Sequence, residues 1–113
     1  MHELTFATEM VRTLQGILQK EGASEVVSIS VEIGAMSGIE REPFAFCFPI
    51  AAEGTPVENA RLIIDETPLS VRCTACKKDS KPEFPTVTCV ECGSSEVEIV
   101  SGRDFVIKSM EVR

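Results

Sequence analysis

Residues 73–92 read CTACKKDSKPEFPTVTCVEC, and this stretch decides how the chain is organised. It holds two C-x2-C pairs, Cys73 with Cys76 and Cys89 with Cys92, separated by 12 residues. Each pair can wrap a metal ion on one tight turn, and the two pairs together supply four thiolates for a tetrahedral site. A module of about 30 residues buries too little surface to fold alone, so a metal must supply the missing stability. The spacing therefore predicts a structural zinc site in an inserted zinc-ribbon-like module.

Two other uses of these thiols fit the same spacing. Iron is also held by four thiolates, and a C-x2-C pair can serve in redox chemistry. One metal ion explains two pairs more simply, and no histidine lies near them, so we expect an all-cysteine site. The fifth cysteine, Cys47, lies in the aromatic stretch FAFCFP (residues 44–49) and is expected to be a small buried hydrophobic residue.

The N-terminal part of the chain predicts a helix followed by a strand. Apolar residues recur with helical spacing along one face, which Met10 and Ile17 widen: Leu4, Ala7, Val11, Leu14 and Leu18. Gly22 is placed to end this helix in a left-handed turn. Apolar residues then alternate with polar ones over residues 27–33, which indicates a half-buried strand that stops at Gly34.

A second helix, a second strand and a last strand complete the predicted fold. Pro43 can occupy the first turn of the second helix, whose inner face holds Phe44 and Phe48 with Ala51 or Ala52. Pro49 is awkward in a helix interior, so we expect a kink or a short helix. The segments RLIIDE (residues 61–66) and RDFVIKSMEVR (residues 103–113) read as strands, the last returning to pair with the first sheet. This order predicts an α+β fold, with one domain of residues 1–68 plus 102–113 and a zinc-binding domain of residues 69–101.

The composition narrows the classes of function. The chain has 113 residues and a net charge of −7, of which residues 1–68 carry −7, residues 69–101 −1 and residues 102–113 +1. Such an acidic chain repels phosphate backbones, which argues against nucleic acid as a partner. We see no apolar run of membrane-spanning length and no signal peptide, and therefore expect a cytoplasmic protein without a membrane partner. The sequence offers no nucleophile motif and no spare histidine as a base, so we do not expect an enzyme.

The only histidine in the chain is His2, directly after Met1 and before Glu3. The Met1 amine and the His2 backbone nitrogen can close a five-membered chelate ring on a metal ion, and the same backbone nitrogen with imidazole Nδ1 closes a six-membered ring. Deprotonated backbone nitrogens favour square-planar Ni(II) or Cu(II) over zinc. Glu3 can add its backbone nitrogen or its carboxylate, and a helix starting just after it would hold the terminus in place. A simpler reading of Glu3, compatible with the first, is that it complements the helix N-terminus electrostatically.

Several motifs together resemble one family. MHE at residues 1–3, VEIGAMSGIE at residues 31–40, the two C-x2-C pairs and SMEVR at residues 109–113 resemble the HypA/HybF family of nickel metallochaperones of [NiFe]-hydrogenase maturation. The resemblance covers essentially the whole chain. It implies a nickel-binding domain built from the N-terminal two-thirds and the last strand, with nickel held by His2, the Met1 amine and the Glu3 backbone. The family's zinc ligands match Cys73, Cys76, Cys89 and Cys92.

The resemblance also implies partners and cofactors. Family members carry nickel, hold a structural zinc ion, work with the nickel-insertion GTPase HypB and deliver metal to the hydrogenase large subunit; some also serve urease maturation. This sequence departs from the common pattern at Val90, where proline is frequent, and it lacks the histidines that some relatives have beside the zinc cysteines. The first departure leaves the zinc ligands intact, and the second puts in doubt any histidine-based pH response of that site.

Two other classes of protein share part of the pattern. The cysteine spacing alone also suits a zinc-ribbon interaction module without nickel transfer, and this is the main alternative. A thiol-redox protein is the second, and thiol titration distinguishes it, because metal-bound cysteines stay protected until a chelator is added. The hypothesis that we prefer is a metal carrier that holds nickel at an exposed N-terminus and releases it by ligand exchange.

Overall fold

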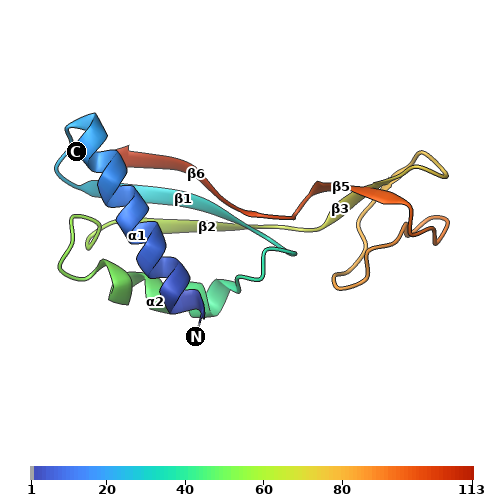
Figure 1. Ribbon diagram of the computed structural model, residues 1–113, viewed down its shortest axis with the longest axis horizontal. Helices are drawn as coiled ribbons and strands as arrows, with labels where there is room; N and C mark the ends of the chain where they lie inside the picture. The colour runs from blue at the N-terminus through green and yellow to red at the C-terminus, as the bar shows by residue number, and fades with distance from the viewer. Residues whose placement is uncertain (1) are drawn as a thin grey trace. The chain divides into compact units, whose positions relative to one another are not determined.

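The computed structural model describes residues 2–113. Over this range the chain forms two helices and six strands, which are α1 (His2–Glu21), β1 (Val26–Gly34), α2 (Arg41–Ala52), β2 (Arg61–Thr67), β3 (Ser70–Cys73), β4 (Asp79–Ser80), β5 (Val97–Ser101) and β6 (Phe105–Val112). The strands make two three-stranded sheets with the orders β2-β1-β6 and β4-β3-β5 (Figure 1). The predicted α+β class is confirmed, and none of these helices is long and apolar enough to cross a membrane.

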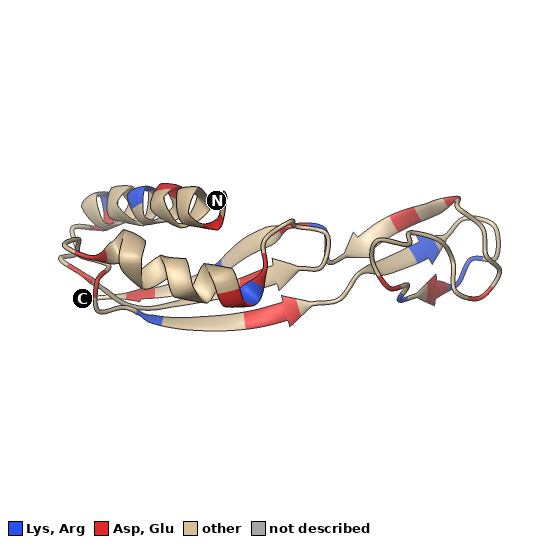
Figure 2. Cartoon of the chain, turned by 90° about the horizontal axis from the view of Figure 1, so that it is seen from below, with Lys and Arg blue, Asp and Glu red and all other residues tan. Residues whose placement is uncertain are grey.

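The β2-β1-β6 sheet carries both helices on one face (Figure 2). The last strand, β6, pairs with β1 at the edge opposite β2, so its predicted return to the first sheet is confirmed. The chain end is fixed to the turn before β1, because the carbonyl of Arg113 accepts the amide hydrogens of Ser24 at 2.8 Å and Glu25 at 3.3 Å. Alternation along β1 places Ile29, Val31 and Ile33 in the core, as the sequence pattern predicts, but at the start of the strand Val26 is buried and Val27 only partly so.

Helix α1 packs through the predicted stripe, with one correction at its start. Ala7, Val11, Leu14 and Leu18 are buried, but Leu4 is 36% exposed and Glu3 is only 6% exposed. The helix begins at His2, not after Glu3, and Glu3 therefore continues the buried row of positions 7, 10 and 14. Gly22 follows the helix with a φ of 66°, the left-handed conformation that the sequence predicts.

Helix α2 lies against α1 through aromatic rings. The ring centroids of Phe6 and Phe44 are 6.0 Å apart, and those of Phe44 and Phe48 are 5.8 Å apart. Cys47 is buried beside them at 2% exposure, as predicted. The helix runs for 12 residues through Pro49 to Ala52, so Pro49 does not shorten it, and the kink that was the other expectation remains a prediction. Proline removes one backbone hydrogen bond but not the packing of Phe48 and Ala52, which are both buried.

The contacts divide the chain into two compact units. The first comprises Met1–Val31, Ile39–Asp65 and Ile107–Arg113, and the second comprises Glu32–Gly38 and Glu66–Val106. The second unit contains the β4-β3-β5 sheet and also the loop after β1, whose residues Ala35 and Met36 donate hydrogen bonds to the carbonyls of Thr67 at 3.0 Å and Gly102 at 2.8 Å. These units are defined by packing contacts, whereas the domains expected from the sequence are defined by the metal that each part binds. The expected boundaries, residues 1–68 plus 102–113 and residues 69–101, therefore remain a prediction.

Candidate metal sites

Four cysteine side chains converge in the second unit. Cys73 ends β3, and Cys76, Cys89 and Cys92 lie in the two turns that follow the C-x2-C pattern. Their Sγ atoms all lie within 4.8 Å of one another, and two contacts of 3.6 Å join the two C-x2-C pairs: Cys73 to Cys92 and Cys76 to Cys89. A zinc ion with Zn–S bonds of about 2.3 Å at the centre of a tetrahedron requires sulfur–sulfur edges of about 3.8 Å. The cluster is therefore consistent with a structural zinc site.

The two turns that carry the cysteines use the same backbone hydrogen bonds. Cys73 donates its amide hydrogen to the carbonyl of Lys78 at 3.0 Å and accepts one from Lys77 at 3.0 Å. Cys89 likewise donates to Ser94 at 2.8 Å and accepts from Gly93 at 2.8 Å. Each turn thus directs two thiols to one point without help from a large core, which is why the short C-x2-C pattern is sufficient to build half of a metal site.

The thiols of each turn differ in acidity. The amide of Cys76, which lies 3.4 Å from the Cys73 sulfur, lowers the pKa of Cys73 below its ordinary value. The amide of Cys92 does the same for Cys89 and lowers its pKa to about 6. At Cys92 the amide of Ser94 lowers the pKa, but the Cys73 thiol and burial outweigh it and raise the value to about 12.

The pKa of Cys76 is also raised. There the amide of Lys78 lowers it, but burial and the thiols of Cys89 and Cys73 outweigh that effect. At neutral pH the metal-free cluster therefore carries negative charge on Cys89, at the first position of its pair. A metal ion must displace protons from the second cysteine of each pair, Cys76 and Cys92.

Lys77 and Gly93 occupy the same position in the two turns, and this equivalence makes a prediction. Both are left-handed, with φ of 65° and 79°, a conformation that costs a non-glycine residue about 1 kcal/mol. Replacing Lys77 with glycine is therefore expected to raise the free energy of unfolding of the zinc-loaded protein by up to about 1 kcal/mol, measured by denaturant titration. Gly93→Lys should lower it by a similar amount. If the two substitutions do not change the free energy of unfolding by similar amounts in opposite directions, the two turns are not equivalent.

An ion pair joins two strands of the small sheet. The Arg72 guanidinium on β3 donates to both carboxylate oxygens of Asp79 on β4, at 2.8 and 3.3 Å. This hydrogen bond holds the pKa of Asp79 below its usual range. The pair is solvent-exposed, so its contribution to stability is small, but it fixes the register of the two-residue strand β4.

The predicted nickel ligands lie at the start of α1, where the structure describes His2 and Glu3 but not Met1. His2 Nε2 lies 3.0 Å from Glu3 Oε2, with the His2 side chain 72% exposed and the Glu3 side chain 8% exposed. The sequence suggests a metal-donor role for the Glu3 backbone nitrogen or carboxylate, or an electrostatic role at the helix N-terminus, but it does not predict this contact with His2. The signal was present in the spacing of Glu3 with Ala7, Met10 and Leu14, which places the carboxylate on the buried face of the helix. The buried Glu3 carboxylate thus contacts the exposed His2 imidazole through its Nε2 atom.

The fold and the cysteine cluster define a small α+β metal-binding protein with a zinc-type site of four thiolates. Residues 1–112 match the protein family described as "Hydrogenase/urease nickel incorporation, metallochaperone, hypA". The chain belongs to this HypA family, and it is therefore a nickel metallochaperone for hydrogenase/urease maturation and not an enzyme.

Curated relatives and solved structures agree with this assignment. The chain is 38% identical over 112 residues to the hydrogenase maturation factor HypA of Chlorobium limicola, covering 99% of this chain and 97% of that protein. It is 32% identical to the HypA of Aquifex aeolicus, covering 99% and 97%. The solution structure of the Ni metallochaperone HypA from Helicobacter pylori has the same fold, with a TM-score of 0.70 at 23% identity over 97% of this chain and 96% of that one.

Proposed function

We propose that this protein binds Ni(II) through the Met1 amine, the backbone nitrogens of His2 and Glu3 and the His2 imidazole, in a planar set of nitrogen donors. Cys73, Cys76, Cys89 and Cys92 hold the structural zinc ion. The protein works in the cytoplasm with the GTPase HypB and delivers nickel to the [NiFe]-hydrogenase large subunit, or to urease through its maturation proteins. Residues 1–68 with 102–113 form the nickel-binding domain, and residues 69–101 form the zinc-binding domain.

The contact between His2 and Glu3 supports this ligand set. A metal-bound histidine usually donates its second ring N–H to a carboxylate or a carbonyl, which fixes the tautomer. Here Nε2 lies 3.0 Å from the Glu3 carboxylate, so Nδ1 is the ring nitrogen with the lone pair. Nδ1 is also the atom that closes a six-membered ring with the His2 backbone nitrogen. Amide hydrogens in the first turn of an α-helix have no acceptor within that helix, and both residues lie in this turn of α1.

The position of the site suits a carrier. His2 is 72% exposed, so an incoming ligand from a partner can approach the metal and replace the donors one at a time. A closed set of four thiolates such as the cysteine cluster leaves no open position for an incoming ligand, and it therefore suits the resident zinc better than the cargo. The same nitrogen donors bind Cu(II) more tightly than Ni(II), so selectivity depends on metal availability and on recognition by partners.

Nickel binding is expected to depend on His2 and on the length of the N-terminus. His2→Ala, and a chain with one extra residue before Met1, should each lose roughly 100-fold or more in nickel affinity, because loss of a ligand costs more than loss of an outer-shell contact. Both proteins should keep their zinc ion. Isothermal calorimetry with nickel, combined with metal analysis of each protein, measures the two effects separately.

Two controls make the assignment specific. Glu3→Gln keeps the backbone nitrogen and a hydrogen-bond acceptor for His2 Nε2, so it should keep most of the nickel affinity. Affinity of the native protein should fall between pH 7.5 and 6.0, because the proposed donors must be deprotonated. Equal nickel binding by all variants, or affinity that is independent of pH, means that the ligands lie elsewhere and leaves the zinc-ribbon interaction module as the better reading.

A further inference from the structure

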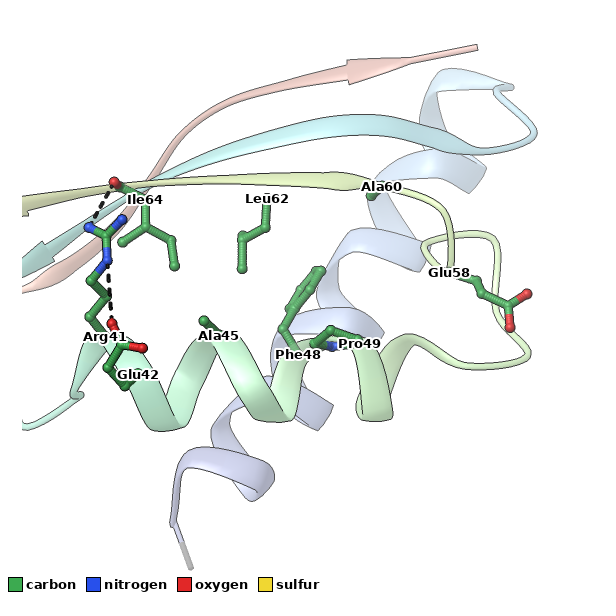
Figure 3. A pocket seen from close by; sticks show the side chains of 9 residues that line it. All are labelled: Arg41, Glu42, Ala45, Phe48, Pro49, Glu58, Ala60, Leu62 and Ile64. Atoms are coloured by element: carbon green, nitrogen blue, oxygen red, sulfur yellow. Dashed lines mark hydrogen bonds and ion pairs between the residues drawn. The ribbon is translucent and has the colours of Figure 1, made fainter.

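A groove with both apolar and charged residues in its lining runs between α2 and the edge strand β2 (Figure 3). Its cavity volume is about 480 Å³, and its apolar lining comes from the helix, the strand and the residue before the strand: Ala45, Phe48, Pro49, Ala60, Leu62 and Ile64. We call this the α2 groove. Leu62 and Ile64 point from β2 towards the helix, and Ala45 and Phe48 point from the helix towards β2 (Figure 3). All of these residues lie within the first compact unit, so the groove belongs to the helix-covered sheet.

Exposed apolar side chains extend the groove over the outer surface of α2. Phe46 is 70% exposed and Ile50 is 50% exposed, and Pro49, also exposed, lies between them in the sequence and lines the groove. Residues 46 and 50 are one helical turn apart, so they form a ridge on one face. Contiguous exposed apolar side chains, unlike single ones, mark interaction surfaces, and burying a phenylalanine is worth about 1.5–3 kcal/mol.

The rim of this surface is acidic. Glu42 and Glu58 line the groove, and Glu53 follows the last residue of α2. Glu58 also accepts the amide hydrogen of Gly54 at 3.2 Å, which holds its carboxylate at the end of the groove. The one basic residue of α2, Arg41, donates to the carbonyl of Ile64 at 3.2 Å and lies 4.0 Å from Glu42. Charge on α2 is confined to its first turn, and Phe46 to Ala52 are uncharged (Figure 2).

We propose that the α2 groove and the Phe46–Ile50 ridge dock a basic amphipathic helix of a partner protein. The partner helix places apolar residues spaced i, i+3/i+4 and i+7 into the groove and over the ridge, and its lysine or arginine side chains face Glu42, Glu53 and Glu58. A second copy of this chain does not fit as well, because the rim would meet a protein with a net charge of −7. The proposal rests on the proposed carrier function in one respect, which is that the partner is a maturation protein.

A photo-crosslinking residue placed at position 46 tests the proposal in the native cell. The side chain of Phe46 is exposed, so the change leaves the fold intact. The expected result is an adduct to a segment of another protein that is predicted helical and carries lysine or arginine beside an apolar stripe, as identified by mass spectrometry. The same residue at Arg12, whose side chain is 71% exposed on α1, is the matched control and should not give this adduct.

The captured segment is then synthesised as a peptide, and its affinity for the purified protein is measured by fluorescence anisotropy. Phe46→Ser should weaken binding at least 10-fold, and Glu42→Lys combined with Glu53→Lys should weaken it and remove its salt dependence. An adduct to a second copy of the chain, to an acidic or non-helical segment, or no adduct at all overturns the proposal. Affinity that Phe46→Ser leaves unchanged overturns it as well.

Nickel calorimetry on the same variants separates this proposal from the carrier function. Phe46→Ser is expected to bind nickel as the native protein does, because position 46 lies outside the proposed ligand set. Docking that persists in a protein without nickel binding would leave the surface established and the ligand assignment wrong. Nickel binding by a protein that shows no docking would support the ligand assignment and overturn the docking proposal.

Discussion

Cys89→Ser is expected to unfold the β4-β3-β5 sheet and to leave the helix-covered sheet folded. The second compact unit contains few buried apolar side chains, and two of them are themselves metal-ligand candidates: Ile33, Leu69, Val71, Cys73 and Cys89. Such a small core supplies little net stability, whereas a structural zinc ion supplies about 10–16 kcal/mol. The first unit has its own core around Leu14, Ile29 and Phe44 and does not need the metal.

The measurement is a two-dimensional NMR spectrum with zinc analysis of the same sample. Amide signals of residues 70–101 should collapse into the unfolded range, while signals of α1 and α2 stay dispersed. Cys47→Ala is the matched control, because it changes a buried cysteine that lies on α2 and does not belong to the cluster, and it should keep a full equivalent of zinc. A Cys89→Ser protein that keeps both its zinc and its dispersed signals would show that the small sheet folds without four thiolates.

The parts of the fold that the sequence predicted are those with a strong local signal. The helical stripe of α1, the alternation in β1 and the paired C-x2-C motif each depend on neighbours along the chain. Each is found in the predicted segment, with departures only at Leu4 and Val27. Strand β4 has only two residues and pairs with β3 through residues such as Asp79 opposite Arg72, and no local sequence pattern indicates this pairing.

At the N-terminus, where we propose the nickel site, the structure differs from the prediction in the geometry of Glu3. MHE indicated a metal site, but the helix was expected to begin after Glu3, and it begins at His2. That shift of register exchanges Leu4 for Glu3 on the buried face and brings the carboxylate to His2 Nε2. Helix boundaries depend on tertiary contacts as much as on propensity, so such a shift is beyond a pattern read from one sequence. The α2 groove also depends on tertiary contacts, because it is formed by a helix and a strand that are separate in the sequence. A pattern read along the chain therefore does not predict it.

Gly102→Ala is expected to be among the most destabilising single substitutions in the second unit. Gly102 has a φ of 87°, and a Cβ atom there would lie 2.4 Å from the carbonyl oxygen of Pro68 and 2.8 Å from the Cα of Leu69. Both are backbone atoms, so no side chain can move aside to make room. Strain at a positive φ and overpacking each cost roughly 1–3 kcal/mol, so the free energy of unfolding should fall by about 2–5 kcal/mol.

Gly38→Ala separates the steric effect from the effect of backbone conformation. Gly38 belongs to the same unit and has a nearly equal φ of 82°, but a Cβ atom there meets nothing within 4 Å. Its substitution should therefore cost only the conformational strain, about 1 kcal/mol. Denaturant unfolding of the two zinc-loaded variants measures the difference. Equal destabilisation would mean that the segments around Pro68 and Gly102 can separate, and that their close approach is not what holds the base of the small sheet together.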